Sequence, residues 1–163
     1  MSRILSVLLA GCLFLVAAPS SVAQEGRITL TARAPFAQIV AAMEQAITDA
    51  GMALVCHANA QRGAAARGVS IRGNQVMMVF RNDFAVRLLA AEPAAGFEAP
   101  IRIYLYENAD GTTSVSYVLP STLFALYRHP EVRAVATELD PIIRGIVDRA
   151  VGPVDPTVLP ARE

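Results

Sequence analysis

The segment IRIYLYENADGTTSVSYVLP, which spans Ile101–Pro120, predicts a β-hairpin and decides the fold class. A turn at Asn108–Gly111 divides the segment, and on both sides of it apolar and polar side chains alternate. Period-2 alternation around an Asp-Gly turn is among the stronger signals for a hairpin. Because proline has no N–H to donate to a strand ladder, we expect the second strand to end at Pro120.

The alternation gives this hairpin two different faces. On the first strand, one face carries the aliphatic residues Ile101, Ile103 and Leu105. The other face carries Arg102, Tyr104 and Tyr106. On the second strand, Ser114 and Ser116 fall on the side of the tyrosines. Tyr117 falls on the opposite side, so two roles stay open for it: lining a pocket or dimer surface with Tyr104 and Tyr106, or packing in the core.

Two further segments carry the apolar stripe of an amphipathic helix, Pro35–Ala50 and the stretch that follows Pro130. Gly51 is typical of the residue just beyond a helix C-terminus. In the second segment we expect Pro141 to kink or split the helix, and Asp140 to cap its second half.

The remaining segments complete an α+β order. Strands are predicted at Arg27–Arg33, Met52–His57 and Gln75–Phe80 (the last a central strand), and short helices at Phe84–Glu92, capped by Asn82 and Asp83, and from Ser121 to Tyr127. Pro93–Pro100 is predicted to be a loop, and Ala58–Gly73 a mobile segment with a short helix around Ala60–Arg67. The order predicts a two-layer fold, a mostly antiparallel sheet with helices on one face and an open polar and aromatic face opposite.

The N-terminus predicts export. A basic start at Arg3, the apolar run Ile4–Ala18 and small residues before Ala23 describe a secretory signal peptide cleaved after Ala23. One domain at 24–150 and a flexible tail at 151–163 would remain, in the periplasm or secreted. Two alternatives stay open: a lipoprotein anchored through Cys12 of Leu9-Ala10-Gly11-Cys12, and an uncleaved membrane anchor.

Charge and cysteine content narrow the function classes. The chain has 14 basic and 14 acidic residues, and every basic residue is an arginine. Nothing in this balance favours a nucleic-acid-binding protein, which needs a basic face. After the predicted cleavage Cys56 is the one cysteine left, so it cannot form an intrachain disulfide.

Short motifs in a fixed order then carry a family resemblance over about residues 34–129. They are a strand that ends in His57-Ala58, the turn Val79–Asp83, the loop Ala94–Ile101 and the hairpin Tyr106–Tyr117. In these the chain resembles the family catalogued as domain of unknown function 302, small α/β domains with no agreed activity. Cys56 replaces the family's usual acidic residue, and Arg81 and Asp83 replace the usual Gly and Pro, which puts any ligand contact of that turn in doubt.

The resemblance and the open face together suggest a ligand site. Its predicted residues are His57, Asn82, Tyr104, Tyr106 and Glu107. Adjacent strand residues point to opposite faces, which disfavours a Cys56–His57 dyad. Cys56 would share the face of Met52 and Leu54 and be buried as a small apolar residue.

Several other residues could bind a metal or take part in chemistry, but each also has a simpler structural role. His57 with Cys56, Met77 or Met78 could hold copper or non-covalent haem, although methionine in an apolar strand is usually core. Covalent haem is excluded because no Cys-x-x-Cys-His is present. For the rest we expect local roles: turn formation for Asp83, Glu107 and Asp110, a helix end for His129, and a solvated loop for Arg62, Arg67 and Arg72.

The sequence therefore predicts a non-enzymatic, exported binding or interaction module with no cofactor. It would form a homodimer, or meet a protein partner, through its open sheet face. A metal- or haem-handling protein is the alternative, and an uncharacterised enzyme comes third.

Overall fold

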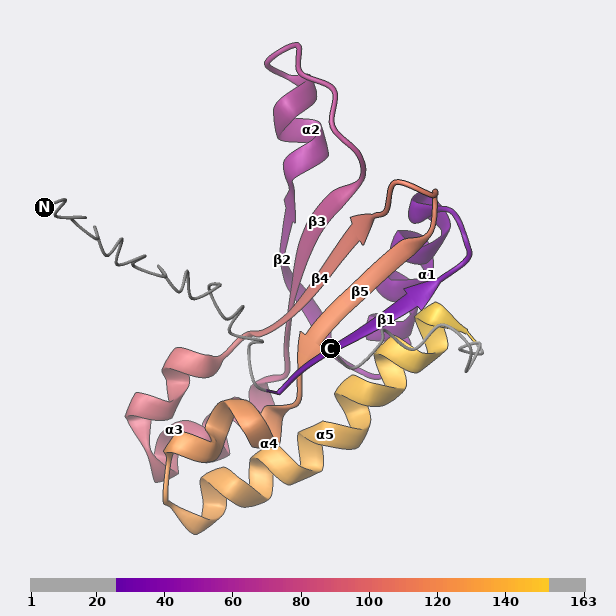
Figure 1. Ribbon diagram of the computed structural model, residues 1–163. Coiled ribbons are helices and arrows are strands. Elements are labelled where there is room, and N and C mark those ends of the chain that lie inside the picture. Colours follow the sequence, from indigo (N-terminus) through magenta and orange to yellow (C-terminus); the bar gives the residue numbers. More distant parts are fainter. Residues whose placement is uncertain (1–25, 153–163) are drawn as a thin grey trace, which may run out of the picture.

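The computed structural model describes residues 26–152, which form one five-stranded sheet with helices on one of its faces (Figure 1). The predicted signal peptide, with the lipid and anchor alternatives, and the predicted tail after Gly152 lie outside the described residues. Within residues 26–152 no helix is long and apolar enough to cross a membrane.

The predicted hairpin forms the middle of the sheet. The strands are β1 (Arg27–Ala32), β2 (Ala53–Asn59), β3 (Asn74–Phe80), β4 (Ile101–Glu107) and β5 (Thr113–Val118), in the order β1-β5-β4-β3-β2 with every neighbouring pair antiparallel. Gly111 has a φ of 82°, and its N–H donates to the Asn108 carbonyl at 3.2 Å. The predicted α+β class and hairpin are confirmed. The strand predicted as central, β3, is an interior strand beside β4.

The helices occupy one layer and the two ends of the sheet. The long helices α1 (Phe36–Asp49) and α5 (Pro130–Val151) cover one face, which we call the helix face (Figure 1). At one end lie α3 (Asn82–Ala91), α4 (Pro120–Leu123) and the 3₁₀ turns η1 (Pro93–Glu98) and η2 (Phe124–Leu126). The short helix α2 (Ala60–Ala65) stands at the opposite end.

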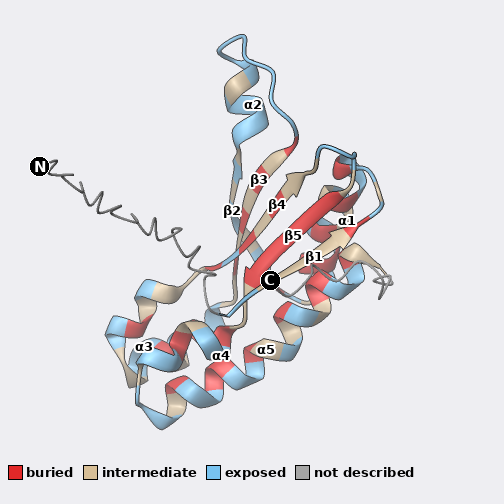
Figure 2. Ribbon diagram, in the orientation of Figure 1, coloured by how far each residue is buried: buried red, intermediate tan, exposed pale blue. Residues whose placement is uncertain are grey.

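The core fills the space between the sheet and the two long helices. Odd-numbered residues of β3, β4 and β5 are buried there, among them Met77, Ile103, Leu105 and Val115, each 0% exposed. Tyr117 is buried with them, so of its two predicted roles the structure shows the core one. Figure 2 shows the matching buried stripe along α5. We call the other face of the sheet the open face, because none of the helices described within residues 26–152 covers it.

Proline does not divide the last helix. The structure has one continuous helix through Pro141, so the predicted split and the predicted Asp140 cap are wrong. Pro141 is exposed, and Leu139 and Ile143 beside it are buried in the core, which keeps the chain helical on both sides. The Asp140 carboxylate instead accepts a hydrogen bond from the Ser121 N–H at 2.8 Å and so ties α4 to α5.

Smaller boundaries also differ from prediction. Asn82 and Asp83 lie in the first turn of α3, and the residue before that helix is Arg81. Pro93–Glu98 is a 3₁₀ helix and not a plain loop. Pro120 ends the hairpin but also begins α4, since a proline is well suited to the first turn of a helix.

A β-bulge corrects the predicted faces of β2. Leu54 pairs with Val79, but the register shifts before Cys56, so that Cys56 pairs with Met78 and His57 with Met77. One extra residue at Val55 moves every later side chain to the other face. Cys56 is therefore exposed on the open face, where burial beside Met52 and Leu54 was predicted.

Residues 60–73, which we call the arm, extend beyond the sheet between β2 and β3 (Figure 1). Asn59 caps α2 by accepting a hydrogen bond from the Arg62 N–H at 2.8 Å, and no residue of α2 is buried. At the base of the arm, Gly73 packs so closely on the Phe36 ring that a Cβ atom would collide with it. Only this base belongs to the packed part of the molecule.

Candidate functional site

The open face is organised as rows of side chains that run across the strands. Met78 pairs with Cys56 on one side and Arg102 on the other, and Arg27 pairs with Val118. A second row joins Ala58, Val76, Tyr104, Ser116 and Thr29. The first row thus combines sulfur, apolar and guanidinium groups on one surface.

A groove of about 690 Å³ lies over these two rows. All five strands contribute to its lining: Arg27, Cys56, Met78, Arg102, Ser116 and Val118 are among the lining residues. The segment Phe97–Pro100, at the end of η1 and just after it, and Leu123 of α4 complete the lining at one end. The volume falls in the range of small-molecule sites in proteins.

Hydroxyl groups fill the other part of the open face. The Thr29 and Ser116 hydroxyls are hydrogen-bonded at 2.8 Å, and Asn108 Nδ2 donates to the Ser114 hydroxyl at 2.9 Å. These bonds satisfy Ser114 and Ser116, which are 4% and 7% exposed. This hydroxyl network links β1, β5 and the hairpin turn, and it fixes the side chains beside the groove.

The two predicted tyrosines lie together on the open face. The rings of Tyr104 and Tyr106 stack with centroids 5.3 Å apart, and the Tyr104 hydroxyl accepts a hydrogen bond from Asn74. Tyr104 lines the groove. Glu107 has a different position, since its carboxylate accepts a hydrogen bond from the Gly73 N–H at 2.9 Å and anchors the arm.

His57 lies on the helix face, with the sheet between it and the tyrosines. Its Nδ1 atom lies 3.3 Å from the Glu44 carboxylate of α1, and its Nε2 atom is hydrogen-bonded to Gln75 Oε1. Gln75 is 6% exposed. This cluster joins α1 to strands β2 and β3, and it is separate from the groove.

The four predicted soft ligands are divided in the same way. His57 and Met77 are partners on the helix face, where Met77 is fully buried, whereas Cys56 and Met78 are partners on the open face. Among residues 26–152, no three His, Cys, Asp or Glu side chains gather as a metal site would require. The chain therefore offers two separate pairs of donors rather than one set of four.

The carboxylates of the predicted turn residues Asp83 and Asp110 are hydrogen-bonded to residues close by in the sequence. The Arg81 guanidinium donates to Asp83 at 2.9 Å and holds the pKa of that carboxyl below its usual value. Hydrogen bonds from Thr112 lower the pKa of Asp110 in the same way. His129 accepts the Glu131 N–H at 3.2 Å as the cap of α5, which is the helix-end position that was predicted.

A family assignment follows from the whole described fold. The model of the family "Domain of unknown function DUF302" matches residues 28–150. The chain belongs to the DUF302 family. This match extends the resemblance predicted from short motifs through the last helix.

A solved DUF302 structure has the same fold. The crystal structure titled as an uncharacterized conserved protein DUF302 from Bacillus stearothermophilus aligns with a TM-score of 0.68 and 16% sequence identity, covering 77% of this chain and 98% of that one. At this identity the likeness shows the fold alone. None of the curated proteins matches the chain.

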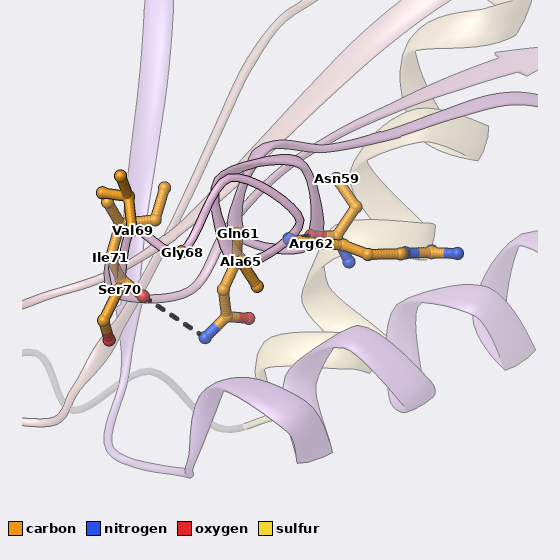
Figure 3. Close-up of a pocket in the computed structure, with 8 residues that line it drawn as sticks. All are labelled: Asn59, Gln61, Arg62, Ala65, Gly68, Val69, Ser70 and Ile71. Atoms are coloured by element: carbon orange, nitrogen blue, oxygen red, sulfur yellow. Dashed lines mark hydrogen bonds between the residues drawn. The ribbon is translucent and has the colours of Figure 1, made fainter.

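This DUF302 chain has a second hollow on the arm. Figure 3 shows the residues that line it, which enclose about 480 Å³ and include Arg62, and the bond from Gln61 to the Ile71 carbonyl. Arg62, Arg67 and Arg72 are exposed, which agrees with the predicted solvated loop. Because α2 buries no side chain in the domain, the hollow depends on contacts within the arm and with Asn59.

Sequence reasoning missed several lining residues of the open-face groove. Arg27 and Val118 belong to strands whose alternation was recognised, and Arg102 was placed on the correct face, but none was proposed as a ligand contact. Their periodicity alone could have put them on the tyrosine side. The strand order that brings Arg27 next to Val118 was the missing information.

Proposed function

We propose that this DUF302 protein is an exported, non-catalytic binding module that holds its ligand on the open face of the sheet. The observation that carries the proposal is the groove of about 690 Å³ to which all five strands contribute side chains. A rigid sheet with a helical layer behind it presents such side chains with little ordering cost. Export rests on the signal-peptide pattern of residues 1–23.

A binding role fits the candidate catalytic groups better than an enzymatic one. Asp83 and Asp110 are held by Arg81 and Thr112, and Glu107 anchors the arm. His57 contacts Glu44 and Gln75 on the helix face. Each of these groups has a structural partner, so none is left to act on a molecule in the groove.

Native mass spectrometry of the chain purified without denaturation tests the binding function. Ala58 is exposed at the edge of the groove, so Ala58→Trp should fill the groove and displace a bound ligand. Ala134→Trp is the matched control, because Ala134 is exposed on α5 in the other layer. A mass adduct in the wild type and the control that Ala58→Trp removes would support the proposal. Its absence, or its persistence in Ala58→Trp, would contradict the proposal.

A second copy of the chain is the other occupant that the sequence predicts for this face. A homodimer through the open face would cover Tyr104, Tyr106 and the groove together. Sedimentation at several concentrations distinguishes the two cases, since a dimer that Ala58→Trp dissociates and that carries no adduct would place a partner where we propose a ligand.

Copper or non-covalent haem binding is the second candidate function. Its specific support is the pairing of Cys56 with Met78, because a thiolate and a thioether together favour Cu(I). Under reducing conditions, Cys56→Ser and Met78→Leu should each abolish stoichiometric copper binding, while Met77→Leu should not. Copper binding, or a Soret band, that is lost only in His57→Ala would instead place the metal on the helix face.

A further inference from the structure

Two arginines lie on either side of one valine in the floor of the groove. Arg27 pairs with Val118, and Val118 follows Tyr117, whose partner Ile103 follows Arg102. Val118 is therefore between the two arginines in a row across β1, β5 and β4. Since neighbouring strands are about 4.8 Å apart, the arginine backbones are about 10 Å apart, and both side chains can reach one anion above Val118.

Both guanidinium groups are available for such an anion. Within residues 26–152, neither Arg27 nor Arg102 has a carboxylate partner, whereas Arg81 and Arg87 are each paired with one or more. A guanidinium presents several N–H donors in a planar fork that matches a carboxylate or a phosphate.

One carboxylate among the lining residues does not cancel this charge. Burial raises the pKa of the Tyr127 phenol, and the nearby Glu98 carboxylate raises it further. Glu98, which also lines the groove, therefore lies beside Tyr127, the residue that follows η2. With Arg27 and Arg102 against Glu98, the lining keeps an excess of one positive charge.

Part of the groove lining is apolar and half-buried, and one apolar residue of the lining is largely exposed. Met78, Val76 and Leu123 line it, and at its rim Phe97 is 87% exposed, the most exposed of the large apolar side chains described. Exposed apolar surface bordered by charged groups marks an interaction site more often than an ordinary surface. A ligand that covers both parts needs an anionic group and an apolar body.

We infer that the groove binds an amphiphilic anion, with its acidic head between Arg27 and Arg102 and its apolar body along Met78 toward Phe97. This inference rests on the proposed binding function and names the ligand class of the same site. The acid group is a carboxylate or another oxyanion on a free small molecule. Salt weakens its binding because part of the attraction is between exposed charges.

Calorimetric titration of the folded, purified chain with dodecanoate tests the inference, below the concentration at which dodecanoate forms micelles. Dodecanol supplies the same apolar body without the charge, and acetate the charge without the body. We expect one dodecanoate per chain, about tenfold weaker binding in Arg102→Gln or Arg27→Gln, and no more than dodecanol-like binding in the double variant. Arg133→Gln, on exposed α5, is the matched control and should bind like the wild type.

Several outcomes would overturn the inference. Equal binding of dodecanol and dodecanoate, removed by Ala58→Trp, would leave the binding function standing but contradict the anionic ligand class. Dodecanoate binding that survives Arg27→Gln/Arg102→Gln, or that Arg133→Gln weakens as much, would be unspecific adsorption. No binding of dodecanoate would also refute the inference, and the native mass measurement would then decide the binding function by itself.

Discussion

Gly73 is the residue at which the arm joins the sheet, and it has no room for a side chain. We predict that Gly73→Ala lowers the free energy of unfolding by about 1–3 kcal/mol, because the new methyl group would collide with the Phe36 ring. Gly63→Ala is the matched control. Its Cβ atom would meet nothing within 4 Å, so denaturant unfolding should show an unchanged or slightly raised stability. Equal losses in the two variants would refute the steric explanation.

His57 is the second residue whose role can be tested separately from the groove. His57→Ala removes the partner of buried Gln75, and we predict a loss of about 1–3 kcal/mol in the free energy of unfolding. Adding Gln75→Met removes the unpartnered amide and should recover part of the loss. Ligand binding in the groove should not change at a temperature where both variants are folded. Lost binding in His57→Ala would show that the histidine takes part in the site.

The faces of Cys56 and His57 could not be predicted correctly from the sequence. Alternation predicted correctly that Cys56 and His57 point to opposite faces, but it assigned each to the wrong face. The extra residue at Val55 has no sequence signature, since an apolar run with a bulge has the same letters as one without. The faces of β4 and β5 were predictable because their alternation is regular and an Asp-Gly turn fixes their register.

At the scale of elements, one arginine joins α3 to α5. Arg87 donates to Glu138 with two nitrogen atoms, at 2.7 and 2.8 Å, and to Glu131 at 2.8 Å. The guanidinium holds the pKa of Glu138 below its usual value, and the carboxylates raise that of Arg87. A carboxyl group whose pKa is lowered by folding stabilises the fold above its unfolded-state pKa, and this contribution is lost as pH falls through the folded-state pKa.

We therefore predict that Glu138→Gln lowers the Tm slightly at pH 7, and that the difference from wild type begins to shrink as pH falls below the ordinary value of 4.5 and disappears once pH is below the lowered folded-state pKa. Arg87→Gln should have the larger effect at pH 7, because it releases Glu131 as well. Thermal unfolding across pH measures both. A difference that stays constant from neutral to acidic pH would show that the charge pair is not the cause.

The elements also show which sequence signals were sufficient. Long apolar stripes predicted α1 and α5, and in α5 the split at Pro141 and the Asp140 cap were the predictions that failed. The missing N–H of a proline weakens one turn, but burial of Leu139 and Ile143 on either side maintains the helix. Helix propensity read from the sequence includes the local cost of the proline, but it does not include the free energy gained when the helix packs on the core.

At the scale of the whole molecule, export is the prediction with the clearest readout. Expression of the full chain in a bacterial host should yield a periplasmic protein that begins at Gln24, because the small residues before Ala23 match a signal-peptidase site. The intact mass of the purified protein measures this directly. A lipid-modified Cys12 would give a membrane-bound product of different mass, and an unprocessed chain would begin at Met1.

The arm gives this molecule a place where the chain can be interrupted at little cost. The sheet holds β2 and β3 together independently of α2, and nothing around Gly68 is near enough to be displaced by an added atom. Trypsin cuts this chain only after arginine, and three arginines of the arm are exposed, so a first cut at Arg67 would leave two fragments that stay associated. The same position would accept an inserted tag or a new pair of termini.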